Sequence, residues 1–513
     1  MAISDISREK FALVKEAALG TQVTDQLLQV CRITSEGLKQ DTDIMTSREI
    51  RDDRQIAAVA RTRIAVSGPI EFEVSFSRSI DELMAAALMS TDVKAQGTLT
   101  MDTLPTDGDT ITIDTTTYTF KDTLAAANQI KIAAADLAAT QASLVATMNG
   151  TGTAGTDYYA GTTTPHPSVR AGAFASDDSI FTALNAGIPG NSIATTETFT
   201  AETNVFDAAT LGTTRAGAGW TAPVTKTAIT LSASSVDNSF NDSGSGFAFT
   251  ANEWVRVSGF ATAANNGHFK IVSATAAKIV VSGGTLVTEA AGESVTITQG
   301  GSITNGTTKN SFNLERTYTD LTTELALYVG CMVNQFNVAI GTNGMIIGSV
   351  GMMGQRETSP NTSGGAGYIQ AETNEIMNSI DHVSRIYEAA AAISLLDFNI
   401  TVTNNLREQP VIGTLGPASF GTNPVNISGS FTAYYESKTL YDKYLDFTTT
   451  SLAIAVQDTD GNGYVIDMPE VKITDGSRNA AAGLGDDFKV PCTFQAFRDA
   501  AEDITIRIVR FAA

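Results

Sequence analysis

Apolar and polar residues alternate along the chain in many short stretches. Residues 70–76 read Ile-Glu-Phe-Glu-Val-Ser-Phe, a pattern that predicts a strand with one buried and one solvated face. Apolar residues between positions 80 and 88 then follow helical spacing, and Ser77 or Ser79 provides an N-cap. The first 96 residues are therefore predicted to fold as strands followed by a short helix.

Between about residues 97 and 300 the chain becomes rich in Thr, Ala and Gly. Residues 110–120 predict a hairpin, and residues 137–148 predict a short helix that Asn149-Gly150 ends. Four further strands are predicted at residues 254–257, 269–272, 278–281 and 294–297. We interpret this stretch as two small modules that meet near residues 200–220.

After about residue 300 the chain resembles its own beginning, which indicates an internal repeat. Residues 427–431 repeat the pattern of residues 66–70, and Asp442 follows at the same offset as Asp81. Two weaker matches extend the repeat. They pair residues 31–33 with 331–333, and Phe312, Leu314, Thr317 and Tyr318 with Phe488, Val490, Thr493 and Phe494.

These observations predict a mainly β protein with short helices, of the α+β class. Two similar β-barrel or sandwich domains are expected, the first interrupted by two inserted modules. The predicted division is residues 1–96 plus 302–325 for copy one, 97–210 for an α+β module, 211–301 for a β module, and 326–513 for copy two.

Composition and charge narrow the function classes. Charged residues make up only 17% of the chain, against about 25% in an average protein. The formal net charge is −22, so the chain repels nucleic-acid phosphates and a basic DNA-binding groove is excluded. The same charge suits a surface that DNA passes without sticking.

The cysteines and the apolar segments argue against an exported or membrane protein. Cys31, Cys331 and Cys492 are odd in number and far apart, which favours buried thiols in a reducing cytoplasm. Lys15 and Glu16 interrupt the only apolar run near the N-terminus, so no secretion signal is expected. The uncharged stretch 325–354 contains many glycines and amides, which favours strands over a membrane helix.

No pattern of catalytic residues is evident. His166, His268 and His382 lie in three different segments, and no common hydrolase, phosphate-binding or zinc motif occurs. Residues 458–463 (DTDGNG) resemble part of a calcium loop, but Pro469 stands where the loop needs Glu. We interpret these residues as a hairpin turn, and we expect no enzyme activity, cofactor or metal.

Several segments resemble the tail-tube proteins of siphophages. In the first copy they are residues 11–16 (FALVKE), 33–36 (ITSE) and 47–55 (SREIRDDRQ). In the second copy they are residues 404–409 (NNLREQ), 427–430 (ISGS) and 440–443 (LYDK). The resemblance covers about residues 1–95 and 302–513, and the stretch 97–300 resembles modules common in phage structural proteins.

The resemblance implies a structural protein of the virion tail, assembled in the host cytoplasm. Its rings would stack helically into a hollow tube that DNA crosses without specific binding. Two domains per chain favour homotrimeric rings with pseudo-sixfold symmetry over rings of six chains. Tape measure, tail terminator and tail tip proteins are the implied partners, and no membrane is involved.

Some residues are candidates for specific roles in such a tube. Glu71 and Glu73 share one strand face and are candidates to line the lumen, although a solvated sheet surface is the simpler explanation. Arg48, Arg51 and Arg54 lie in a polar loop that is a candidate inter-ring contact. The alternatives are a capsid decoration protein, a distal tail component, or a cell-surface adhesin built from β-modules.

Overall fold

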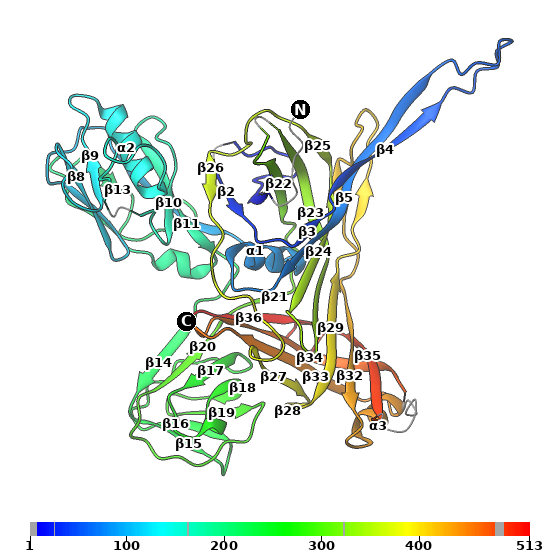
Figure 1. Ribbon diagram of the computed structural model, residues 1–513. Helices are drawn as coiled ribbons and strands as arrows, with labels where there is room; N and C mark the ends of the chain where they lie inside the picture. The colour runs from blue at the N-terminus through cyan, green and yellow to red at the C-terminus, as the bar shows by residue number, and fades with distance from the viewer. Residues whose placement is uncertain (1–7, 25, 162–163, 322–323, 478–486) are drawn as a thin grey trace. The chain divides into compact units, whose positions relative to one another are not determined.

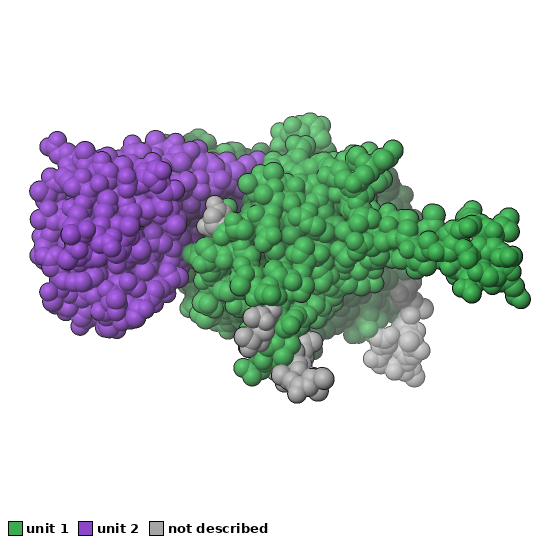
Figure 2. Space-filling model, turned by 90° about the horizontal axis from the view of Figure 1, so that it is seen from above, with its two compact units in different colours: residues 1–90, 223–513 green, residues 91–222 purple. Residues whose placement is uncertain are grey.

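The computed structural model describes residues 8–24, 26–161, 164–321, 324–477 and 487–513 (Figure 1). Strands dominate the chain, and the described residues contain three α-helices, so the predicted mainly β class with short helices is confirmed. The chain forms two compact units, one of residues 1–90 and 223–513 and one of residues 91–222 (Figure 2).

A first set of strands in unit 1 pairs in the order β4, β5, β24, β23, β22, β1. The helix α1 follows β5 in the chain, and the Ser77 hydroxyl accepts a hydrogen bond from the Ile80 amide at its N-terminus. The bounds are β1 (Glu9–Lys15), β4 (Lys39–Thr46), β5 (Val59–Glu73), α1 (Arg78–Ala87), β22 (Ser311–Tyr318), β23 (Leu325–Gly341) and β24 (Ile347–Gly354).

A second set pairs in the same way, in the order β29, β32, β35, β34, β33, β27. Its helix α3 follows β32, as α1 follows β5. The β-bulge between Val333 and Gln335 in β23 recurs between Ile473 and Asp475 in β34. The bounds are β27 (Val383–Glu388), β29 (Leu395–Thr403), β32 (Asn426–Tyr434), α3 (Thr439–Leu445), β33 (Thr449–Gln457), β34 (Gly463–Gly476) and β35 (Lys489–Ala496).

Strand neighbours test the individual sequence matches. Gly68 in β5 and Gly429 in β32 hold the same place, as predicted, and Asp81 and Asp442 both lie in the first turn of their helices. The match of Phe312 with Phe488 is wrong, because β22 has the neighbours of β33 and not those of β35. The match of Cys31 with Cys331 is also wrong, because Cys31 follows the short strand β2 whereas Cys331 lies inside β23.

Pairing also places β23 and β24 in the first set, although the predicted division assigned residues 326–513 to copy two. The division into copies therefore stays a proposal. Shorter strands extend the two sets, namely β2 (Leu27–Val30), β3 (Ser35–Glu36), β21 (Gly301–Thr304), β25 (Arg356–Thr358), β26 (Gly367–Ile369), β28 (Ala391–Ala392) and β36 (Arg507–Phe511). The strands β30 (Arg407–Gln409) and β31 (Ser419–Gly421) form a separate two-stranded sheet.

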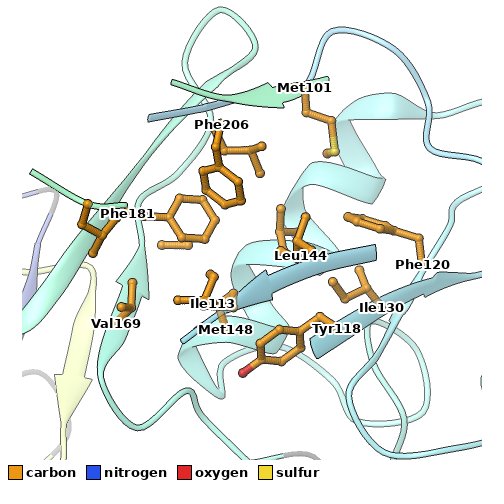
Figure 3. Close-up of a cluster of buried hydrophobic side chains, with 14 of the residues drawn as sticks. Met101, Ile113, Tyr118, Phe120, Ile130, Leu144, Met148, Val169, Phe181 and Phe206 are labelled. Carbon is orange, nitrogen blue, oxygen red and sulfur yellow. The ribbon is translucent and has the colours of Figure 1, made fainter. Parts of the chain in front are cut away.

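Unit 2 packs α2 (Leu137–Asn149) against two small sheets around its own apolar core (Figure 3). The predicted hairpin is formed by β7 and β8, and the predicted helix ends at Gly150 in the left-handed conformation, with φ 66°. Its strands are β6 (Lys94–Thr100), β7 (Thr110–Ile113), β8 (Thr116–Lys121), β9 (Gln129–Lys131), β10 (Val169–Ala171), β11 (Asp178–Ala186), β12 (Thr195–Glu197) and β13 (Val205–Phe206).

Residues 224–299 form a seven-stranded sheet with a separate apolar core, within unit 1. We call these residues the capping module. The four strands predicted between residues 254 and 297 are all present. Its strands are β14 (Val224–Ala228), β15 (Leu231–Ser234), β16 (Ser239–Asp242), β17 (Trp254–Ser258), β18 (Gly267–Ala274), β19 (Lys278–Ser282) and β20 (Val295–Gln299).

The capping module covers a face of the second set that a different segment covers in the first set. In the first set, Val23 and Leu28 pack on Ala12 of β1. In the second set, Trp254 of the capping module packs on Tyr387 of β27, with ring centroids 5.5 Å apart. Ala12 and Tyr387 hold the same place in their sheets. Ala12 lies in β1, which pairs with β22 next to β23, and Tyr387 lies in β27, which pairs with β33 next to β34.

Polar contacts fix the capping module on this face. The Tyr387 hydroxyl donates to the His268 carbonyl at 2.6 Å, and Arg256 donates to the Ala512 carbonyl at 3.0 Å. The His268 ring is fully buried, and its Nδ1 lies 3.2 Å from the Ser384 hydroxyl. Burial, with the nearby charges of Arg256 and Arg385, lowers the pKa of His268 to about 3, so this ring is neutral at pH 7.

Candidate assembly interface

The two sets are joined by one antiparallel strand pair, β23 with β29. The register runs from Gln335 opposite Thr403 to Gly341 opposite Asp397. This join produces one continuous run of eight strands, β4-β5-β24-β23-β29-β32-β35-β34, with four strands from each set. The join lies along the middle of unit 1 in Figure 1.

The outer edges at the two ends of this eight-stranded run correspond to the two sides of the β23–β29 join. At one end, no strand of the described residues pairs with the outer edge of β4, which holds the place that β29 has in the second set. At the other end, β33 pairs with β34 only as far as Lys472. Beyond Lys472, residues 473–476 pair with β35 alone within the described part of the chain.

A buried polar cluster also ties the first set to the second. The Asp81 carboxylate of α1 accepts hydrogen bonds from the Tyr464 hydroxyl at 2.8 Å and from Arg510 at 2.6 Å. Burial raises the pKa of Asp81, against the opposing effect of Arg510 and Tyr464, and burial beside Asp81 raises that of Tyr464. The sequence marked Asp81 only as a repeat position, because its partners are 383 and 429 residues away along the chain.

The eight-stranded run has one apolar and one polar face. Residues directly opposite one another share a face, and one buried row contains Ile70, Val350, Phe336, Val402 and Ile427. The other face carries polar rows. One of these rows contains Glu71, Ser349, Asn337, Thr401, Ser428 and Gln495.

Glu71 and Glu73 both lie on this polar face. Glu71 is exposed and accepts a hydrogen bond from the Ser35 hydroxyl at 2.8 Å, and Glu73 is partly exposed. Between these rows, Asn337 donates to Thr401 at 2.8 Å. Most side chains of this polar row are therefore uncharged hydroxyls and amides. The sequence did not predict this composition, because the row is built from six strands that lie far apart in the chain.

Arg48, Arg51 and Arg54 all lie in the exposed connection between β4 and β5. Arg51 forms an ion pair with Asp53 at 2.8 Å, and Arg54 adopts a left-handed conformation with φ 57°. The three arginines are thus near one another in the chain and accessible to another molecule. Figure 1 shows the β4–β5 hairpin extending well beyond the sheet.

Residues 458–462 form the turn of the β33–β34 hairpin, as predicted, and Gly463 begins β34. Asp458 accepts a hydrogen bond from the Asn462 amide at 2.7 Å, which closes the turn. In the described ranges, no group of three or more His, Cys, Asp or Glu side chains is placed to hold a metal ion. None of the described helices is long and apolar enough to cross a membrane.

Comparison with known proteins gives one family. A family model described as phage tail tube protein matches residues 6–259 and residues 208–496. No curated protein matches the chain. The double match agrees with a duplicated tube domain and supports a structural, non-enzymatic role. It gives no support to the capsid decoration, distal tail or adhesin alternatives.

Proposed function

Because the chain belongs to the phage tail tube protein family, we propose that three copies form each ring of a siphophage tail tube. One observation carries this proposal. The β23–β29 join links two sets of four strands within one chain, and the run ends in edges that match the two sides of that join.

The same join repeated between chains closes a ring. Placing the first set on the second puts β23 on β34 and β4 on β29. A join of the same kind between chains therefore pairs the end of β34 in one chain with β4 of the next chain. Such a head-to-tail contact either closes or continues as a filament. Six sets close the ring with pseudo-sixfold symmetry, and closure removes the exposed strand edges.

The polar face of the eight-stranded run is the proposed lumen surface. Its opposite face is buried apolar core, so only the polar face is left to meet a passing polymer. Hydroxyl and amide groups offer no fixed charge to phosphates, and Glu71 and Glu73 repel them. DNA would therefore cross the lumen during ejection without specific binding.

The remaining partners follow from a tube of this kind. Arg48, Arg51 and Arg54 are proposed to contact the adjacent ring, since they project on the β4–β5 hairpin. A tape measure protein would occupy the lumen before DNA, and terminator and tip proteins would close the two ends. Assembly would take place in the host cytoplasm, and the finished tube would be part of the virion tail.

Electron microscopy with helical reconstruction of the purified chain tests the proposal. We expect hollow tubes in which each ring contains three chains and six similar lumen domains. Tubes with six chains per ring would keep the tube function and reject the trimer. A chain that forms no ring or tube, alone or with its tail initiator, would reject the proposed function.

Charge reversal on the polar face should slow DNA passage. Glu71→Lys with Glu73→Lys replaces two negative charges per chain with two positive ones, so repulsion of the phosphates becomes attraction. We expect ejection to slow about tenfold or more at low salt. The measurement is the rate of DNA release from assembled virions. Asp122→Lys with Glu202→Lys, two exposed positions in unit 2, is the matched control. Normal release from tubes of the first variant would argue against a lumen position.

A further inference from the structure

A small apolar cluster inside the chain spans the junction between the two sets. Met89, directly after α1, packs with Met332 of β23 and with Leu406 and Phe420 from the hairpin that connects β29 to β32. All four side chains are buried. The cluster therefore fastens the end of the first helix to the hairpin of the second set.

One half of an equivalent cluster lies beside α3. Phe447 follows the C-cap residue Asp446 with φ 49°, as Met89 follows the C-cap residue Leu88 with φ 48°. Lys472 holds the place of Met332, and its Nζ lies 4.2 Å from the centre of the Phe447 ring. Yet Phe447 is 54% exposed, whereas Met89 is 7% exposed.

The other half lies on the β4–β5 hairpin. Leu406 stands two residues before Glu408, which pairs with Phe420. Ile44 stands two residues before Thr46, which pairs with Val59. Ile44 and Val59 therefore match Leu406 and Phe420 in their hairpin, but they are 66% and 59% exposed.

We propose that Phe447 of one chain packs against Ile44 and Val59 of a neighbouring copy of the same chain. The contact reproduces the internal cluster of Met89, Leu406 and Phe420 at the junction between chains. A single chain does not bring the two halves together, since α3 and the β4–β5 hairpin lie at opposite ends of unit 1 (Figure 1). This inference rests on the proposed ring and names the side chains that close it.

Burial of apolar surface on both partners accounts for aliphatic and aromatic side chains that are exposed in the single chain. Isolated exposed apolar residues are common in soluble proteins. Here, however, the exposed residues occupy the positions whose counterparts are buried in the same chain. Leu445 directly precedes the C-cap residue of α3 and is 59% exposed, whereas Ala87, which directly precedes the C-cap residue of α1, is buried.

Disulfide crosslinking of assembled tubes tests the contact. The variant with Phe447→Cys and Ile44→Cys should give a ladder of monomer, dimer and trimer on a non-reducing gel, ending at the trimer. Phe447→Cys with Ile412→Cys is the control, because Ile412 is fully exposed at the tip of the other hairpin. Native Cys331 and Cys492 are buried, and Cys31→Ser in both variants removes the partly exposed third thiol.

A second measurement covers the case in which the cysteines disturb assembly. Phe447→Asp should abolish ring formation while leaving the monomer's thermal unfolding unchanged, and Val236→Asp, at an exposed valine of the capping module, should assemble normally. Tubes that form without crosslinks above the control pair, or tubes that form from Phe447→Asp, would overturn this contact and leave the tube function intact. A wild-type chain that never assembles would instead reject the proposed function itself.

Discussion

Deletion of the capping module is expected to prevent soluble folding of the second strand set. Without residues 224–299, an apolar face that contains Tyr387, Val509 and Phe511 would meet water. Burying one large apolar side chain contributes about 1.5–3 kcal/mol, so loss of this cover costs on the order of 5 kcal/mol. An uncovered apolar patch of this kind also promotes aggregation. The soluble fraction after expression and the thermal unfolding midpoint would measure the effect.

The geometry of the module makes the deletion feasible without straining the remaining chain. Val224 and Gln299 pair directly across β14 and β20, so a short linker joins the flanking residues. Deletion of residues 92–218 is the matched control, because Val93 and Ala218 are also bridged and unit 2 has its own core. We expect the control to stay soluble. Equal solubility of the two deletions would show that the capping module is dispensable for the second set.

Replacing Lys270 with Met is expected to destabilise unit 1 by about 3–5 kcal/mol, as loss of one partner from a buried ion pair does. The Lys270 ammonium lies 3.0 Å from Asp467 and 3.0 Å from Glu502, whose side chains are 2% and 9% exposed. Burial disfavours the charged lysine, but these two carboxylates outweigh it and hold the pKa of Lys270 above its ordinary value. Without the lysine, Arg507 alone would face both carboxylates.

A surface lysine of the same module provides the control. Lys278 pairs with Asp237 at 2.8 Å, but both side chains are more than 40% exposed. Lys278→Met should therefore change the free energy of unfolding by only about 0–1 kcal/mol. Chemical denaturation of the two variants would compare them, and Asp467→Asn added to Lys270→Met should recover part of the loss. Equal losses for the two lysines would contradict a buried role for Lys270.

The ion pairs around Lys270 connect the capping module to two distant segments of the second set. Asp467 lies in β34 and Glu502 precedes β36, whereas Lys270 lies in β18. Together with Trp254 on Tyr387, these contacts make the capping module part of unit 1 rather than an appended domain. The two insertions of the chain therefore differ in kind, since unit 2 is compact by itself.

The local elements were determined by the sequence alone. Alternation in residues 70–76 predicted the end of β5, Ser77 was one of two predicted caps of α1, and Gly150 ended α2 as expected. These features depend on neighbours within a few residues, so local patterns predict them. Six short segments, among them residues 47–55 and 404–409, also indicated the tail-tube family, and the family model agrees.

Only the tertiary structure decided which strands correspond and which surfaces remain uncovered. Phe312 and Phe488 share a spacing because every half-buried strand alternates, and only strand neighbours distinguish β22 from β35. The role of Asp81 required partners from β34 and β36, and the exposure of Phe447 required comparison with the buried Met89. Pairing between residues hundreds of positions apart leaves no local pattern, which is why the sequence predicted the elements but not the junction they build.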